Sequence, residues 1–563
     1  MLHASVAPIT HGLSPVSLAL AYADWAWHLG VSPGRQLELL TLATKLGTNV
    51  LQGQDTPGAA TGAADGDPRY RHAAWDTWPF NVMRNAFHNA EAFWREAARA
   101  PGMTAHHGAM AEFFARQWLG LAAPANWLAT NPVVLQETAR TGGANLLQGA
   151  QNLIEDMSAL ATGADNPTQQ GFVVGRNLAV TPGKVVFQNR LIELIRYDAQ
   201  TATVFPEPVL IVPSWIMKYY ILDLSPHDSM VRYLVGRGHT VYMLSWLNPD
   251  SADHDLSMDD YLKLGVFDAL QAVGALQASG HAVHAVGYCL GGTLLAIAAA
   301  AAARPGGLAG AGALPALKTI TLLAAQTDFS EPGELGLFID EGQIGFLDSI
   351  TRGRGYLSGG QMAGSFQFLH SRDLVWTRRM REYLMGEREK PTDLMAWNAD
   401  TTRMPARMHH EYLTSLYLHN ALATNSYPVQ GRAVALDDIA MPVFLVGTQR
   451  DHISPWRSVY KLHRLADAEI CFVLTSGGHN SGIVSEPGHA GRSYQIGTRP
   501  EHGGWVPPEQ WVAETPSVEG SWWPAWHRWL SRHSSRRRPA QATPAAAVLR
   551  DAPGDYVRRR FRD

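Results

Sequence analysis

Apolar residues recur at helical spacing through the first third of the chain. The pattern covers residues 17–46 and resumes from Trp75 to about residue 165, with aromatic residues such as Phe113 and Trp118 among its apolar positions. We expect these aromatic side chains to pack in a helical core, which is a far commoner role than a ligand cage. The intervening residues 53–70 are rich in Gly, Ala, Asp and Pro, a composition typical of a flexible linker.

From Val185 the pattern changes to short apolar runs that alternate with helical segments. The runs are a predicted strand pair, VVFQNRLIELIRY at Val185, followed by VLIVP at Val209, TVYMLSW at Thr240, AVHAVGY at Ala282, TITLLAA at Thr319, VFLVGT at Val443 and EICFVLT at Glu469. Because several of them are apolar throughout, we predict an α/β fold with a mainly parallel sheet buried on both faces. The alternation stops between Ala325 and Asp438, which predicts an inserted, largely helical cap.

Composition narrows the class of protein. The 563 residues are 46% hydrophobic and 17% charged with a net charge of -4, which indicates a globular protein of two or more domains. These values exclude a disordered chain and a generally basic nucleic-acid binder. The two cysteines cannot form a disulfide framework, and their scarcity fits a reducing cytoplasm.

The two ends of the chain carry weaker signals. The first twenty residues lack a cationic segment ahead of an apolar run, and no apolar run reaches the length of a membrane span, so we expect a cytoplasmic protein. After about Ser531 the chain becomes locally basic and poor in apolar residues. A solvated tail that is dispensable for the chemistry is the favoured prediction, and a docked tail or a contact with an anionic surface is the alternative.

One of the two cysteines lies in a motif. Gly287-Tyr288-Cys289-Leu290-Gly291 fits the G-x-nucleophile-x-G elbow, with cysteine in place of the commoner serine, and it falls between a predicted strand and an alanine-rich predicted helix. That context is the one the elbow requires, because the turn projects the nucleophile above the sheet. The start of the helix also favours a thiolate over a thiol.

The elbow predicts its partners in chain order. Asp451 follows the run VFLVGT and His479 follows the run EICFVLT, which are the positions expected for the acid and the histidine. We therefore predict that Cys289, Asp451 and His479 form one catalytic constellation, with His479 as the base that deprotonates the thiol. His452 and His284 are expected to be surface or core residues.

The oxyanion hole should use two main-chain amides. One is the N–H of Leu290, directly after the nucleophile, and the other belongs to the loop after VLIVP, around Trp215 or Ile216. A cysteine nucleophile suits acyl exchange between thioesters, because attack on a thioester yields another thioester at little net cost in free energy.

In its motifs the sequence resembles the poly(3-hydroxyalkanoate) synthases of the long, single-subunit type called class I. The resemblance runs from about Trp75 to Leu530 through the ordered motifs WLATNP at Trp127, VGRNLAVTPGKVVFQN at Val174, KYYILDLSPHDSMVRYLVGRGHTVYMLSWLNPD at Lys218, GYCLGGT, DLMAWNAD at Asp393, DHISPW and GSWWPAWHRWL at Gly520. It implies an α/β-hydrolase fold and polymerisation of (R)-3-hydroxyacyl-CoA with release of CoA. The family's nucleophile, acid and histidine map to Cys289, Asp451 and His479.

Two departures from the family pattern lie close to the expected site. The usual cysteine-isoleucine-asparagine of the oxyanion loop is Trp215-Ile216-Met217 here, and the stretch HNSGIV that starts at His479 also differs. Both lie near the expected acyl pocket, so they bear on the preferred acyl chain length more than on the reaction.

These patterns together divide the chain into five segments. They are a helical N-terminal extension (1–52), a flexible linker (53–70), a helical N-terminal domain (71–175), an α/β-hydrolase catalytic domain (176–533) with a cap insertion at about 326–438, and a basic C-terminal tail (534–563). The resemblance implies a homodimer at a polyester granule surface in the cytoplasm. We expect no metal, no nucleic acid and no cofactor other than the CoA of the substrate.

Three questions stay open at the level of sequence. An acyl-CoA thioesterase or a polyester depolymerase would carry the same three residues, and a non-catalytic granule scaffold would use the N-terminal helices and the basic tail. Asp451 either only orients His479 or helps to deprotonate the 3-hydroxyl of the substrate. The second role is favoured because a thiol needs less help than an alcohol to lose its proton.

Overall fold

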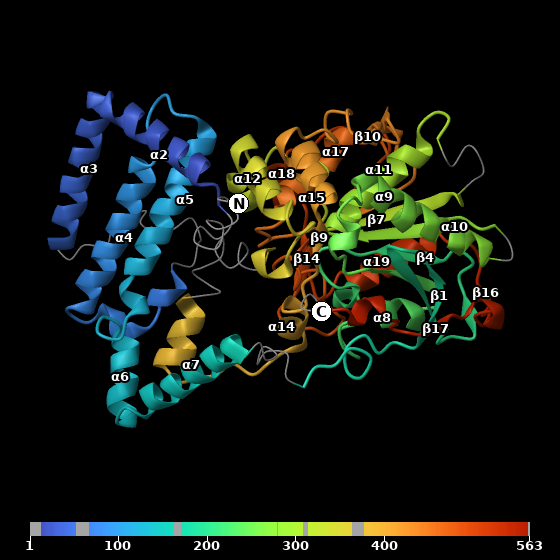
Figure 1. Ribbon diagram of the computed structural model, residues 1–563, viewed down its shortest axis with the longest axis horizontal. Helices are drawn as coiled ribbons and strands as arrows, with labels where there is room; N and C mark the ends of the chain where they lie inside the picture. Colours follow the sequence, from blue (N-terminus) through green and yellow to red (C-terminus); the bar gives the residue numbers. More distant parts are fainter. Residues whose placement is uncertain are drawn as a thin grey trace. The chain divides into compact units, whose positions relative to one another are not determined.

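The computed structural model describes residues 13–51, 67–162, 171–277, 280–307, 314–362 and 376–560. The chain forms two compact units (Figure 1), of which the first comprises Met1–Thr168 with Ala363–Pro391 and the second comprises Gln169–Met362 with Thr392–Asp563. Residues 53–66, most of the predicted linker, lie outside the described residues.

The N-terminal unit is helical. Its helices are α2 (Pro15–Gly30), α3 (Pro33–Leu51), α4 (Phe80–Ala97), α5 (Ala105–Ala122), α6 (Pro132–Thr141) and α7 (Ala144–Thr162). Side-chain caps start several of them: Thr104 accepts a hydrogen bond from the His107 amide, and Asn131 caps α6 ahead of Pro132. Phe113 is buried as predicted, but Trp118 is 72% exposed and does not belong to the core.

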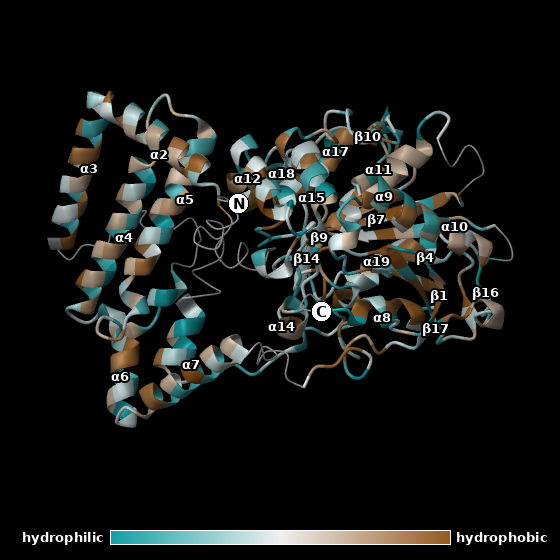
Figure 2. Cartoon of the chain, in the orientation of Figure 1, coloured by the Kyte–Doolittle hydropathy of each residue, from teal (hydrophilic) through white to brown (hydrophobic). Residues whose placement is uncertain are grey.

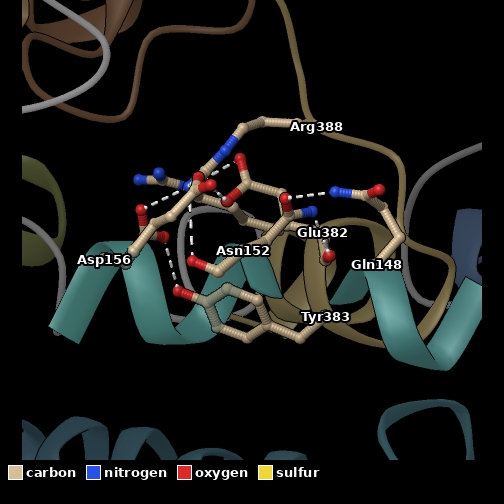
Figure 3. Close-up of polar contacts among 8 residues, drawn as sticks. Gln148, Asn152, Asp156, Glu382, Tyr383 and Arg388 are labelled. Carbon is tan, nitrogen blue, oxygen red and sulfur yellow. Dashed lines mark hydrogen bonds and ion pairs between the residues drawn. The ribbon is translucent and has the colours of Figure 1, made fainter. Parts of the chain in front are cut away.

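The second segment of this unit is described from residue 376 to residue 391. It packs against α7, as Figure 3 shows. Gly149 lets the helix approach closely, because a Cβ there would overlap the main-chain carbonyl of Tyr383 in η10 (Met380–Leu384). Polar bonds flank this contact: Asn152 Nδ2 donates to Glu382 O (2.9 Å), and Arg388 pairs with Asp156 (2.8 Å). Part of the segment predicted as cap, residues 376–391, therefore covers an N-terminal helix.

The second unit is built on an eleven-stranded sheet in the order β15-β14-β13-β12-β7-β6-β4-β5-β2-β1-β17. The six central strands are parallel: β4 (Val209–Val212), β5 (Val241–Trp246), β6 (Val283–Tyr288), β7 (Leu317–Leu323), β12 (Val443–Thr448) and β13 (Ile470–Thr475). Antiparallel strands flank them: β1 (Gly183–Gln188), β2 (Ile192–Tyr197), β14 (Ser493–Arg499), β15 (Ser517–Glu519) and β17 (Arg550–Asp551). The predicted runs and the strand pair at Val185 are confirmed, and Figure 2 shows the hydrophobic character of the central strands.

Helices pack around this sheet. They include α8 (Met230–Gly236), α10 (Asp268–Ala275), α11 (Leu290–Ala303), α16 (Trp456–Tyr460), α18 (Pro508–Glu514) and α19 (Trp523–Arg532). Helix α11 is buried from Leu290 to Ala302, which explains its run of small alanines. Between β7 and β12 this unit carries α12 (Glu341–Thr351), α14 (Asp393–Asn398), α15 (Ala406–Tyr412) and η11 (Leu413–Leu418). Within the described part of the chain, every helix is too short or too polar to cross a membrane.

The C-terminal segment is docked, not solvated. Strand β17 extends the sheet, and the fully buried carboxylate of Glu193 accepts hydrogen bonds from the Asp555 and Tyr556 amides, each at 2.9 Å, and pairs with Arg550. Sequence composition favoured a solvated tail because the segment is basic. The buried Glu193 reverses that expectation, since a buried carboxylate requires such partners.

Candidate active site

Cys289 lies on a strained turn between β6 and α11. Its φ and ψ are 53° and -124°, which places a non-glycine residue in the left-handed region of φ. Close packing on both sides explains the glycines of the motif: a Cβ at Gly287 would overlap Gly292, and a Cβ at Gly291 would overlap the carbonyls of Val212 and Pro213. The turn therefore holds Cys289 above the sheet and against the end of β4, as an elbow requires.

The structure brings the predicted acid and histidine to this edge of the sheet. His479 Nδ1 lies 2.8 Å from Asp451 Oδ2, which also accepts a hydrogen bond from Thr448 Oγ1 (2.9 Å). The other oxygen, Oδ1, accepts from the amides of Ile453 (2.9 Å) and Ser454 (2.8 Å). These four bonds occupy a carboxylate that has no exposed side-chain surface, so Asp451 contacts the reaction only through His479.

Electrostatics favour a charged histidine between the other two residues. Burial lowers the pKa of His479, but the negative charges of Asp451 and Cys289 and a hydrogen bond to each outweigh it and raise that pKa well above its ordinary value. Burial raises the pKa of Asp451, but His479 and the hydrogen bonds from Ser454 and Thr448 bring it below its ordinary value. The site therefore stabilises His479 as an imidazolium beside the Asp451 carboxylate.

The predicted oxyanion residues lie on the two segments that meet at the elbow. Leu290 is the first residue of α11, so its N–H has no acceptor within the helix. Trp215 and Ile216 lie in the loop that leaves β4. A Cβ at Gly291 would overlap the Pro213 carbonyl at the start of this loop, so the loop and the start of α11 are in direct contact. Both candidate amides therefore belong to the same small region beside Cys289.

Two tyrosines of the cap complete the surroundings of the thiol and were missed by the sequence analysis. Tyr412 donates a hydrogen bond to Tyr417 (Oη to Oη, 2.9 Å), and its ring packs edge-on against Trp215 with centroids 6.1 Å apart. Burial is the main cause that raises the pKa of each tyrosine above its ordinary value, and the charge of Cys289 adds a smaller contribution to both. No spacing rule marks these residues in the sequence, because they come from a helix of the cap and not from a strand end.

The two histidines that the sequence analysis set aside have other surroundings. His284 is fully buried and lies within hydrogen-bond distance of Thr319 (2.8 Å) and Ser534 (3.0 Å), so it is a core residue. His452 is exposed next to Asp451.

One cluster of metal-ligand type occurs among the described residues, and it lies in the N-terminal unit. Asp67, His88 and Glu91 have ligand atoms within 4.8 Å of one another. The Arg69 guanidinium pairs with Asp67 (2.6 Å) and also approaches Glu91 (3.6 Å), so it supplies the positive charge that a cation would bring. The cluster is therefore an ion-pair network, in which Asp67 and Arg69, at the start of the N-terminal domain, are joined to Glu91 of α4.

Comparisons with known proteins match both the N-terminal part of the chain and its catalytic unit. A family model described as "Poly-beta-hydroxybutyrate polymerase (PhaC) N-terminus" matches residues 66–234, and one described as "Poly-beta-hydroxybutyrate polymerase N terminal" matches residues 1–35. The second match lies within the predicted N-terminal extension. A model of the alpha/beta hydrolase fold matches residues 207–486, which confirms the predicted fold class.

Similar full-length proteins come from several bacteria. A poly(3-hydroxyalkanoate) polymerase of Methylorubrum extorquens is 38% identical over 87% of this chain and 80% of that protein. The polymerase subunit PhaC of Cupriavidus necator is 36% identical over 88% of this chain and 84% of its own length. Polymerase 2 of Ectopseudomonas oleovorans is 30% identical over 92% of this chain and 90% of its own length.

Proposed function

This chain belongs to the poly(3-hydroxyalkanoate) polymerase family, and we propose that it polymerises (R)-3-hydroxyacyl-CoA into polyhydroxyalkanoate with release of CoA. The growing polyester would be carried as a thioester on Cys289. The observation that carries this proposal is a cysteine on a nucleophile elbow beside a His479–Asp451 pair.

In the first step His479 takes the proton of the Cys289 thiol, and the thiolate attacks the carbonyl carbon of the substrate thioester. The negative charge that develops on the carbonyl oxygen would be stabilised by the N–H groups of Leu290 and Ile216. The carbon–sulfur bond to CoA then breaks and the proton on His479 passes to the CoA sulfur. The raised pKa of His479 supports this assignment, because the histidine becomes an imidazolium when it takes the thiol proton.

In the second step the 3-hydroxyl of one hydroxyacyl unit attacks the thioester carbonyl of another. A base must take the hydroxyl proton, and we assign this role to His479, with Asp451, 2.8 Å from its Nδ1, stabilising the resulting imidazolium. The ester bond forms as the carbon–sulfur bond breaks, and the thiolate recovers the proton. Water in place of the hydroxyl would terminate the chain, so the buried Tyr412 and the partly buried Tyr417 of the cap would favour polymerisation by excluding it.

Incubation of the purified protein with (R)-3-hydroxybutyryl-CoA tests this proposal, with free CoA thiol and polymer followed in the same sample. We expect stoichiometric CoA release and polymer. CoA release without polymer would favour a thioesterase or depolymerase with the same site. An absence of CoA release would favour a non-catalytic granule scaffold.

We also propose a homodimer that acts at the surface of a polyester granule, since the relatives are polymerases whose product is a water-insoluble polyester. Analytical ultracentrifugation with and without substrate tests the dimer. Fractionation of cells that accumulate polymer tests the association with granules.

A further inference from the structure

The loop that carries the second oxyanion amide is held by hydrogen bonds from outside the elbow. Residues 213–218 leave β4 and meet the segment that returns from the cap after α14 (Asp393–Asn398). In this returning segment, Thr402 donates its hydroxyl to Trp215 O (2.7 Å) and its amide to Ile216 O (3.3 Å). Thr402 is 1% exposed, so solvent does not compete for these bonds.

These bonds fix the direction of the Ile216 amide. In a planar trans peptide the carbonyl of one residue and the N–H of the next point in opposite directions. Because the Trp215 carbonyl points at the Thr402 hydroxyl, the Ile216 N–H of the same peptide points away from the returning segment. A rotation of this peptide, which would turn the amide out of the oxyanion hole, would break the hydrogen bond to Thr402.

The far end of the loop is anchored as well. Trp397 Nε1 donates to Lys218 O (2.7 Å), and Lys218 Nζ, which is buried, donates to Arg559 O of the C-terminal segment (2.6 Å). Asn248 Nδ2 also donates to Arg559 O (3.3 Å). The loop is therefore tied at one end to the elbow and at the other to the returning segment and the docked C-terminal segment.

We propose that Thr402 is a positioning residue for the oxyanion hole, which holds the Ile216 amide toward the reacting carbonyl. The proposal rests on the proposed acylation of Cys289. The proposal gives Thr402, a residue of the cap, a role in positioning the oxyanion hole. Neither the elbow motif nor the three predicted catalytic residues point to this role. It also explains why a hydroxyl is buried against this loop, since a valine of the same shape would leave the Trp215 carbonyl without its partner.

Thr402→Val tests the proposal. It removes the hydroxyl with little change in shape, and Thr402→Ser keeps the hydroxyl. With (R)-3-hydroxybutyryl-CoA we expect Thr402→Val to lower kcat by about three- to tenfold with KM nearly unchanged, because the lost bond acts mainly in the transition state. Thr402→Ser should retain most of kcat. If the valine variant is insoluble, Thr402→Ala replaces it.

A second measurement separates positioning from general damage. Alkylation of Cys289 by iodoacetamide forms no oxyanion, so its rate should be unchanged in Thr402→Val while single-turnover acylation by the CoA ester slows. Thr414→Val is the matched control, because the Thr414 hydroxyl is buried in η11 with no hydrogen-bond partner among the described residues. We expect that variant to behave as the parent protein does.

The possible results differ in meaning. Equal slowing of alkylation and acylation, or unchanged acylation in Thr402→Val, would overturn the positioning role. Loss of acylation in the parent protein itself would instead refute the proposed function. Slower acylation with normal alkylation and recovery in Thr402→Ser supports the proposal.

Discussion

Replacing Asp451 with asparagine should slow elongation more than acylation. The change keeps the shape of the side chain and preserves Oδ1, the acceptor for the Ile453 and Ser454 amides. At the other position it places an NH2 group against two donors, His479 Nδ1–H and the Thr448 hydroxyl. The variant therefore loses the carboxylate's charge and its bond to the histidine together.

The magnitude follows from that bond. A hydrogen bond to a charged group contributes about 1.5–3 kcal/mol, which corresponds to about ten- to a hundredfold in rate. Without Asp451 the burial that lowers the pKa of His479 is no longer balanced, so the histidine becomes a weaker base. The step in which the histidine deprotonates the alcohol should be slowed by the full ten- to hundredfold. Acylation should suffer less than tenfold, because a thiol is far more acidic and the thiolate itself still stabilises the imidazolium.

Single-turnover acylation of Asp451→Asn, measured beside its steady-state polymerisation, tests this reasoning. Mass spectrometry of the denatured protein would show short acyl chains on Cys289 if elongation is the slow phase. Thr448→Val is the matched control, since it removes a neutral bond to the same oxygen and leaves the charge. Equal slowing of both phases would refute the preferential role in elongation and leave Asp451 as an orienting residue alone.

Three further predictions concern the thiols and the C-terminus. Cys289→Ala should abolish CoA release with an unchanged thermal midpoint, and turnover above background would contradict the assignment. Cys471, whose pKa burial raises to about 11, should resist alkylation below about pH 10; Cys471→Ala should lower the thermal midpoint yet keep activity, and a folded but inactive variant would count against it. Removing residues after Arg538 should lower solubility or the thermal midpoint, because Glu193 would lose Arg550 and two amides; an unchanged midpoint would show that these bonds contribute little.

Much of the catalytic unit could be predicted because its signals are local. A strand buried on both faces is an apolar run, and the elbow adds a fixed spacing of small residues around Cys289. Asp451 and His479 were found because parallel strands end at one edge of a sheet, where residues distant in the chain meet. The geometry of their contact, 2.8 Å between Nδ1 and Oδ2, agrees with that logic.

Most of the residues that the sequence analysis missed make contacts with residues far away in the sequence. Thr402 and Tyr412 come from the cap, whose helices carry no spacing that points to the site. The docking of the C-terminal segment depends on Glu193, and a single acidic residue in a strand gives no sign that it will be buried. The prediction that Trp118 lies in the core was wrong, because an apolar pattern does not show which side of a helix packs against another element.

The contact between Gly149 and Tyr383 has a consequence for the order of events during synthesis. The ribosome produces α7 well before residues 376–391, and the first half of the catalytic sheet is made in between. The nascent N-terminal helices therefore emerge with the face of α7 around Gly149 uncovered, and they complete their packing only after the chain has been extended past Pro391. A polypeptide that ended at Thr168 would leave this face uncovered, so it is a poor choice for isolated expression, whereas co-expression with a fragment that contains residues 376–391 could restore the contact.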